Sequence, residues 1–335
     1  MTQKARWGIL ATGGIAHSFA GDLVLDGHTI AAVGSRHRDS ADAFAAQYGI
    51  PHAYGSYEEL VADPDVDIVY VATPHPFHAR DAALALRAGK HVLVEKPITL
   101  NAAEAQGLVD LAAERGLLIL EAMWTRFLPH VVRIREIIAE GTLGTLRSFT
   151  ADHRQKLPDD PAHRINAPEL GGGALLDLGI YPVSFAAHLF GSPRDVLATA
   201  VFGPTGVDAQ VATLFRYADG QIATTLSAAH SRGPNTASIV GTDARIDIDG
   251  VWYTPTTFRV TDASGTVLET WQNQVPGRGM QYQAREAERL LAAGKTASEI
   301  LSPAESVSIM TTMDEIRRQI GLAYPSEKAA GAVAR

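Results

Sequence analysis

Hydrophobic residues follow two alternating patterns over the first part of the chain. Short apolar runs occupy residues 7–11, 29–34, 67–72, 91–94 and 117–120. Ala-rich amphipathic stretches lie between them, at residues 14–25, 40–48, 75–88 and 101–115. Apolar runs this short, bounded by Gly, Pro and Asp, are typical of strands buried on both faces. Their alternation with helices predicts a parallel sheet with right-handed crossovers.

Residues at the ends of the amphipathic stretches support this division. Asn101 is a candidate N-cap, with Glu104 three residues later in a capping-box pattern. Gly89 and Gly116 follow the last residues of two stretches. We expect both glycines to adopt the left-handed conformation that commonly ends a helix.

The pattern changes after about residue 125. Three glycines at 171–173 open an apolar stretch that predicts a helix to about residue 190. Alternating or β-branched runs follow, at residues 196–202, 209–217, 221–229, 237–240, 245–248, 257–260 and 267–271. Turn signals such as Asp219-Gly220 separate them, and two helices are expected at 280–293 and 304–320. This half predicts a large, mostly antiparallel open sheet with helices on one side.

The length of 335 residues favours two domains over one core. We expect an α/β fold in which residues 1–125 form a Rossmann dinucleotide-binding domain. Residues 126–325 are expected to form an α+β substrate-binding and dimerisation domain, and residues 326–335 a flexible tail. The strands around residues 221–230 carry little charge, so the uncovered sheet face predicts a sheet-to-sheet homodimer.

Composition and charge narrow the classes of function. A formal net charge of -8 argues against nucleic acid or an anionic membrane as partner. The chain has no cysteine, which removes disulfides, thiolate nucleophiles and cysteine-ligated metals. No signal-peptide pattern and no run of roughly 18 apolar residues is found, so a cytoplasmic location is expected.

A nucleotide-binding motif follows the first predicted strand. The order Ala11-x-Gly13-x-x-Ala16 matches the dinucleotide fingerprint G-x-G-x-x-G/A except for its first glycine. The N-terminus of the following helix would hold the pyrophosphate. The expected cofactor-binding residues here are Ala11, Thr12, Gly13, Gly14 and Ile15. A glycine-rich turn without a ligand is the alternative.

The end of the second predicted strand indicates which dinucleotide is bound. Ser35, Arg36 and Arg38 stand where NAD enzymes usually place an acid for the ribose 2′-hydroxyl. Two guanidiniums and a hydroxyl suit a 2′-phosphate. We therefore expect NADP, with NAD less favoured. Solvated surface arginines are the alternative.

Two more clusters follow the ends of predicted strands, where ligands bind in open α/β sheets. We expect Thr73, Pro74, His75 and His78 to wall the cofactor groove, although helix capping or packing explains the two histidines equally well. Glu95 and Lys96 leave the end of another apolar strand side by side, and both are also expected to bind the cofactor. A lysine there can hold a substrate oxygen or move a proton, and a surface ion pair is the alternative.

A third cluster lies on the helix after the glycine run. Asp177 and Tyr181 are four residues apart and so share a helix face. The glycines before them would permit close approach to a ligand. A carboxylate and a phenol on one face suit a sugar or diol. An aspartate favouring the helix dipole and an ordinary half-buried tyrosine are the alternative.

These motifs occur in an order and spacing that resemble the Gfo/Idh/MocA family of oxidoreductases. The resemblance covers nearly the whole chain, to about residue 325. The run Glu121-Ala-Met-Trp124-Thr-Arg126-Phe127 is most similar to the family's dimeric dihydrodiol dehydrogenase and NADP-dependent D-xylose 1-dehydrogenase branch. The motifs of the resemblance are Ala-Thr-Gly-Gly-Ile-Ala at 11–16, Ser35-Arg36, Thr73-Pro74, Glu95-Lys96-Pro97 and the run from 171 to 181.

The resemblance implies roles for individual residues. Lys96 matches the family's catalytic lysine, whose bond to the following proline is often cis, and Asp177 matches the substrate-binding aspartate. Many members have His where this chain has Tyr181, but the dihydrodiol branch has Tyr there and is thought to use it as acid/base. A neighbouring Lys96 ammonium would favour the phenolate. In the alternative assignment Lys96 carries the proton and Tyr181 orients the substrate.

The resemblance also suggests the substrate site and the reaction. Trp124, Arg126 and Phe127 are the further candidates for substrate binding. The expected activity is an NADP-dependent dehydrogenase or reductase acting on a sugar, polyol or diol. Open alternatives are a reductase of a dicarbonyl or anhydro-sugar and a non-catalytic NADP-sensing regulator. A metal site is not expected, because the spacing of the candidate ligands fits no ligand pattern. Those candidates are Asp152, His153, His163 and His188.

Overall fold

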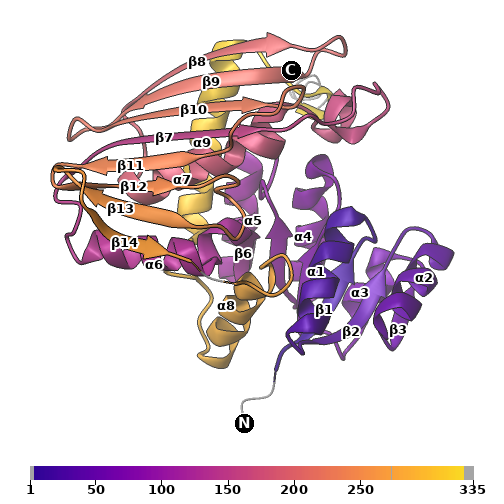
Figure 1. Cartoon of the computed structure of the whole chain (residues 1–335). Coiled ribbons are helices and arrows are strands. Elements are labelled where there is room, and N and C mark those ends of the chain that lie inside the picture. Colours follow the sequence, from indigo (N-terminus) through magenta and orange to yellow (C-terminus); the bar gives the residue numbers. More distant parts are fainter. Residues whose placement is uncertain (1–3, 273, 328–335) are drawn as a thin grey trace. The chain divides into compact units, whose positions relative to one another are not determined.

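The computed structural model describes residues 4–272 and 274–327. These residues form two compact units (Figure 1). The first unit comprises Met1–Phe127 and Val275–Val307, and the second comprises Leu128–Gln274 and Ser308–Arg335.

The first unit is built on a six-stranded sheet in the order β3-β2-β1-β4-β5-β6, and every strand pair is parallel. The strands are β1 (Arg6–Leu10), β2 (Thr29–Gly34), β3 (His52–Tyr54), β4 (Ile68–Val71), β5 (His91–Glu95) and β6 (Ile119–Ala122). The helices are α1 (Gly14–Leu25), α2 (Arg38–Tyr48), α3 (Tyr57–Ala62), α4 (His78–Arg87), α5 (Ala102–Arg115) and α8 (Gln281–Ala292). This strand order identifies a Rossmann fold, whose switch point lies between β1 and β4.

The predicted alternation in this half is confirmed. Its capping details are also observed: the Asn101 side chain accepts a hydrogen bond from the Glu104 backbone N–H at 2.9 Å. Gly89 and Gly116 have φ angles of 80° and 64°. The short elements β3 and α3 were not predicted, because three and six residues are too few to show a periodic pattern.

The division into units differs from the expected one in a single segment, because Val275–Val307 packs with the first unit. Buried acceptors explain this arrangement. Asp22 of α1 accepts hydrogen bonds from the backbone N–H of Arg278 at 2.9 Å and of Met280 at 2.7 Å. Glu288 of α8 accepts the indole N–H of Trp7 at 3.0 Å. A hydrophobic pattern alone does not reveal such long-range polar partners.

The second unit carries an eight-stranded sheet in the order β14-β13-β12-β11-β7-β10-β9-β8. Its strands are β7 (Leu146–Arg154), β8 (Asp195–Phe202), β9 (Asp208–Arg216), β10 (Ile222–Ala228), β11 (Ala237–Gly241), β12 (Ala244–Ile248), β13 (Phe258–Asp262) and β14 (Val267–Trp271). Only the β7–β10 pair is parallel among the strands described, so the mostly antiparallel open sheet is confirmed.

Helices cover one face of this sheet. They are α6 (Pro129–Ala139), α7 (Ile180–Phe190), a π-helical turn at Leu175–Gly179 that leads into α7, and α9 (Pro303–Ile320). Gln319 of α9 accepts the backbone N–H of Ala198 in β8 at 2.9 Å. The segment Pro168–Phe190 is long and apolar enough to cross a membrane, but 78% of its window is buried inside the fold, as in a core helix.

Two elements of this unit, α6 and β7, were not predicted. In β7 only Phe149, Ala151 and His153 are buried, and the positions between them are polar and partly exposed. The strand therefore lacks an apolar run, although it lies at the centre of the sheet.

The first two residues of the expected tail lie beside α9. Glu327 accepts two hydrogen bonds from the Arg317 guanidinium, at 2.8 Å and 2.9 Å, so residues 326 and 327 are held to α9. The remainder of the predicted tail, residues 328–335, lies outside the described residues.

Candidate active site

The turn after β1 has the geometry of a dinucleotide-binding loop. Ala11 has a φ angle of 85°, a left-handed conformation that the fingerprint's first glycine would adopt without strain. A Cβ at Gly13 or Gly14 would meet no protein atom within 4 Å. The N-terminus of α1 has no side-chain cap. Thr12 and Ile15 lie in the same turn. The residues present therefore fit a phosphate group that accepts hydrogen bonds from backbone N–H groups.

The end of β2 presents the three residues expected at the ribose. Ser35 is buried, whereas Arg36 and Arg38 are exposed. Arg38 donates to Asp42 one turn along α2 at 2.9 Å, and Arg36 hydrogen-bonds the Tyr57 side chain. Both guanidiniums lie at the surface, where a ligand phosphate can reach them.

The segment after β4 combines a buried hydroxyl with a fully buried histidine. Among the described residues, the Thr73 Oγ1 is buried without a hydrogen-bond partner, which fits a polar ligand atom at the switch point. The His78 ring nitrogens lie 2.8 Å from the Pro97 carbonyl oxygen and 2.7 Å from that of Thr73. Burial lowers the pKa of His78, against the effect of the two carbonyls. His78 therefore ties two loops together, and His75 packs edge-on against its ring.

Glu95 and Lys96 separate into two environments at the end of β5. The Glu95 carboxylate is buried and accepts hydrogen bonds from the Tyr70 hydroxyl and from the Lys96 backbone N–H. Burial raises the pKa of Glu95. The Lys96 side chain is partly exposed, and its bond to Pro97 is cis. Glu95 thus holds the backbone beside the lysine.

A second buried acid supports the same loop from β6. Glu121 accepts the backbone N–H of Ile98 at 3.1 Å and the Ser306 hydroxyl at 2.7 Å. Burial raises the pKa of Glu121 to about 7. Glu121 therefore fixes the segment that follows Lys96, although its sequence position indicated only the start of a family motif.

The three residues expected to bind substrate after β6 are all buried. Trp124 and Phe127 are 2% and 4% exposed, and the Arg278 guanidinium lies 5.4 Å from the Trp124 ring centroid. Arg126 is 1% exposed and forms an ion pair of 2.6 Å with Glu305. This pair holds the Arg126 guanidinium against Glu305 of α9, and its contact with substrate stays a prediction.

In the second unit, Asp177 and Tyr181 lie on consecutive turns of one helical segment. Asp177 belongs to the π-helical turn Leu175–Gly179, and Tyr181 is the second residue of α7. π-helical turns within α-helices occur frequently at functional sites, because they change which side chains face a neighbour. The Asp177 Oδ2 accepts from the Arg164 guanidinium at 3.0 Å.

The glycine run before this segment makes room for protein atoms. A Cβ at Gly172 would lie 2.7–2.9 Å from three backbone carbonyl oxygens, those of Ile165, Arg164 and Ala167. Gly173 has a φ of +119°, and its Cβ would lie 2.0 Å from Asp208 Oδ1. The glycines therefore allow close packing of the loop that carries Arg164, whereas the sequence pattern predicted room for a ligand.

Asp208 anchors the start of the helical segment. Its Oδ2 accepts the Leu175 backbone N–H at 2.6 Å, and its side chain is fully buried. Burial raises the pKa of Asp208 to about 7. A buried carboxylate at a helix N-terminus is stabilised by the free N–H groups there.

Three residues beside Asp177 and Tyr181 were not predicted as substrate or catalytic residues: Arg164, His153 and Tyr253. The His153 ring stacks on Tyr253 at a centroid distance of 3.6 Å and meets Tyr181 edge-on at 5.0 Å. His153 Nδ1 lies 3.1 Å from the Leu178 carbonyl oxygen. No local motif marks these residues, because they come from a strand and two irregular loops.

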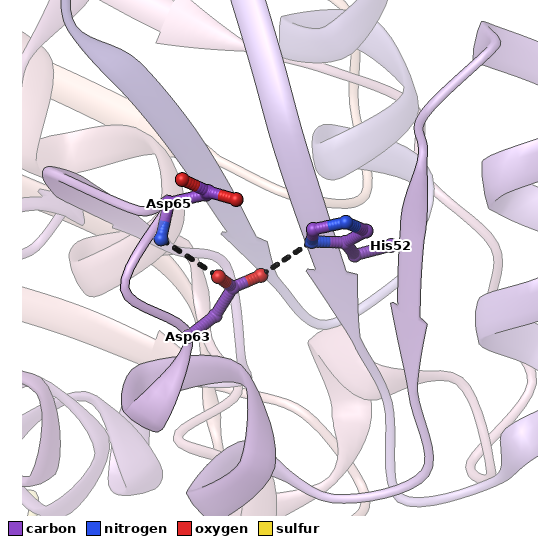
Figure 2. A group of neighbouring side chains, drawn as sticks. All are labelled: His52, Asp63 and Asp65. Atoms are coloured by element: carbon purple, nitrogen blue, oxygen red, sulfur yellow. Dashed lines mark hydrogen bonds and ion pairs between the residues drawn. The ribbon is translucent and has the colours of Figure 1, made fainter.

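The metal-ligand candidates have other partners. His163 Nδ1 accepts the Ile165 backbone N–H at 3.4 Å, and Asp152 accepts from Arg154 at 2.9 Å. Ligand atoms converge in one group within the described part of the chain, His52, Asp63 and Asp65 (Figure 2). Asp63 accepts from His52 Nδ1 and from the Asp65 backbone N–H, both at 2.8 Å. These bonds explain the cluster as a hydrogen-bonded junction.

Comparison with known proteins identifies the family. Residues 5–122 match the oxidoreductase family with an NAD-binding Rossmann fold, and residues 131–247 match the GFO/IDH/MocA C-terminal domain. The chain belongs to the Gfo/Idh/MocA oxidoreductase family. It is 35% identical to the trans-1,2-dihydrobenzene-1,2-diol dehydrogenase of Danio rerio over 332 residues, which cover 96% of this chain and 98% of the relative. The expected family resemblance is confirmed.

Solved structures agree with this assignment. KijD10, a 3-ketoreductase from Actinomadura kijaniata crystallised with NADP and TDP-benzene, is 26% identical with a TM-score of 0.83. The match covers 95% of this chain and 98% of that one. The aldose-aldose oxidoreductase from Caulobacter crescentus, complexed with glycerol, is 25% identical with a TM-score of 0.85, covering 95% and 97%. The fold is therefore shared over nearly the full length.

Proposed function

We propose that the protein is an NADP-dependent dehydrogenase or reductase that acts on a sugar, polyol or diol. The observation that carries the proposal is the near-full-length similarity to trans-1,2-dihydrobenzene-1,2-diol dehydrogenases. Asp177 and Tyr181, on consecutive turns of one helical segment, agree with it. Such a substrate needs a carboxylate that accepts hydrogen bonds from its hydroxyls and a phenol that exchanges a proton with one of them.

Each candidate residue receives one task. Tyr181 takes the hydroxyl proton during oxidation and returns it during reduction. The Lys96 ammonium favours the phenolate that this exchange requires. Asp177 accepts hydrogen bonds from substrate hydroxyls. When bound, the nicotinamide supplies or accepts the hydride.

NADP is proposed as the cofactor because Ser35, Arg36 and Arg38 follow β2, and no acid precedes Asp39 there. The loss of one charge-assisted hydrogen bond to a phosphate costs about 1.5–3 kcal/mol, or roughly tenfold to hundredfold in affinity. Arg36→Ala should therefore lower the preference for NADP⁺ over NAD⁺ by at least about tenfold in initial-rate assays. An unchanged preference would contradict this assignment.

The activity is tested by nicotinamide absorbance with D-xylose, D-glucose and a trans-dihydrodiol. Lys96→Met should abolish turnover while NADPH binding, followed by fluorescence, persists. Tyr181→Phe keeps the ring and should lower kcat by about 10²–10⁴ if Tyr181 carries the proton, but should change mainly KM if it only orients the substrate. Wild-type turnover in Lys96→Met would refute the proposal. Tight NADPH binding with no turnover of any substrate would favour a cofactor-sensing protein.

The proposal includes a homodimer formed through the outer face of the eight-stranded sheet. Leu197 and Val201 of β8 are 58% and 63% exposed, and their spacing of four residues places them on one face of the strand. Leu197 pairs with Leu214 of β9, and Ile222 of β10 is 44% exposed. These side chains form an apolar strip that a second copy can cover.

Light scattering tests this assembly directly. Leu197→Glu should shift the mass toward one chain at micromolar concentration. Leu25→Glu is a matched control, since Leu25 is 57% exposed but lies in α1 of the first unit. A monomeric wild type, or equal effects of both substitutions, would count against the dimer.

A further inference from the structure

The Asp177 carboxylate has an unequal partner in Arg164. The two side chains form an ion pair with an Nη2–Oδ2 distance of 3.0 Å. The Asp177 side chain is only 8% exposed, whereas that of Arg164 is 53% exposed. One member of the pair is therefore enclosed by protein, and the other is open on part of its surface.

The backbone of Arg164 is held firmly against the segment that carries Asp177. The Ile165 carbonyl accepts the Gly173 backbone N–H at 2.8 Å, and the Ile165 side chain is fully buried against Ala174 and Leu178. Asn166 donates to the Pro158 carbonyl oxygen at 2.8 Å. The backbone position of Arg164 is thus set by the same packing that positions the segment with Asp177.

The two members of the pair have different electrostatic needs. An enclosed carboxylate is costly without a counter-charge, and Arg164 supplies it. The guanidinium of Arg164 is half-exposed, so water already solvates part of its charge. It also carries five N–H donors in a planar fork, and its exposed half makes donors accessible to a bound molecule.

We propose that Arg164 is a specificity-determining residue, which donates to the substrate oxygen adjacent to the hydroxyl that Asp177 accepts from. The inference rests on the proposed function and names its substrate class: molecules with two oxygens on neighbouring carbons, as in a vicinal diol or an α-hydroxy carbonyl. An acceptor and a donor held 3.0 Å apart match two adjacent oxygens. A substrate that lacks one oxygen displaces water from the guanidinium without replacing its hydrogen bond, so the site discriminates against it.

The test compares a sugar with its 2-deoxy analogue. D-glucose and 2-deoxy-D-glucose are assayed with wild type, Arg164→Gln, Arg164→Lys and the control Lys156→Gln. Lys156 lies in the same loop, is 55% exposed and also pairs with an acid, Asp159. Arg164→Gln should reduce the preference in kcat/KM for the hydroxylated sugar by about tenfold. Arg164→Lys keeps the charge but loses the planar fork of donors, so its preference should lie between those of wild type and Arg164→Gln. Lys156→Gln should have the wild-type preference.

A purely structural role gives a different pattern. Arg164→Gln would then lower kcat/KM for both sugars equally and leave their ratio within twofold of wild type, which overturns the proposal. If neither sugar is turned over, the proposed activity on sugars fails separately. Calorimetric binding of the same two sugars to the NADP-loaded protein then decides: discrimination in wild type that is lost in Arg164→Gln supports the role of Arg164. Equal binding of the two sugars to wild type, or no binding of either, overturns it.

Discussion

Replacement of Gly173 by alanine tests how the helical segment with Asp177 and Tyr181 is positioned. Gly173 has a φ of +119°, a conformation that L side chains rarely adopt. A Cβ there would also lie 2.0 Å from Asp208 Oδ1 and 2.9 Å from its Cγ. The Asp208 side chain cannot move away freely, because it is fully buried and accepts the Leu175 backbone N–H.

The cost of backbone strain and the cost of the collision with Asp208 can be separated by a matched substitution at the other end of the helix. Gly191 ends α7 with a φ of +74°, and a Cβ there meets no atom within 4 Å. Gly191→Ala therefore has only the backbone strain, of about 1–3 kcal/mol. Gly173→Ala adds an overpacking cost of about 1–3 kcal/mol. The sum of about 2–6 kcal/mol is a large part of a typical unfolding free energy of about 5–15 kcal/mol.

Denaturant unfolding followed by steady-state kinetics measures both effects. Gly173→Ala should be less stable than Gly191→Ala by about 1–3 kcal/mol and should lose turnover, because the start of the segment with Asp177 must shift. The double variant Gly173→Ala/Asp208→Ala should lose less unfolding free energy than the sum of the two single losses, because the carboxylate that collides with the new Cβ is gone. Equal stability of Gly173→Ala and Gly191→Ala would refute the argument that the collision matters.

Two further outcomes are expected. Ala11→Gly should raise the unfolding free energy by about 0.5–1 kcal/mol, since relief of a left-handed alanine outweighs the greater entropy of glycine in the unfolded chain; a loss of stability in denaturant titration would contradict the φ of 85°. Burial raises the pKa of Glu121 from 4.5 to about 7, so the folded state binds this proton more tightly and stability is lost as pH rises between these values. Glu121→Gln removes that loss, and its stability relative to wild type should rise by about 2 kcal/mol between pH 5.5 and 8; a gap that is independent of pH would be inconsistent with a buried ionisation.

The fold could be predicted from the sequence wherever the hydrophobic pattern repeats over a full element. Apart from β3 and α3, the strands and helices of the Rossmann unit were expected close to their observed bounds, as were the runs that became β8 to β14. β7 was not, because one face of this central strand is open and its polar positions interrupt the apolar ones. Long-range polar contacts, such as that of Glu288 with Trp7, determine which unit a helix joins, and no local pattern records them.

The candidate site could be predicted where a motif depends on backbone geometry. The residues 11–16, the cis Lys96–Pro97 bond and the helical segment carrying Asp177 and Tyr181 lie on the elements that the motifs indicated. Side-chain partners could not be predicted in the same way. Arg126 has a place in a family signature but is paired with Glu305, whereas Arg164 has no motif and contacts Asp177.

The buried acids explain why sequence patterns describe this kind of site incompletely. Glu95, Glu121 and Asp208 accept backbone N–H groups of Lys96, Ile98 and Leu175. Burial raises the pKa of each acid, which means that the protein interior disfavours the ionised carboxylate. An apolar residue of similar size would avoid this desolvation cost. It would also leave a loop N–H without an acceptor, beside Lys96 or at the start of the turn with Asp177. An acid next to a catalytic motif can therefore hold the backbone in position without transferring a proton. Only the three-dimensional structure separates these two roles.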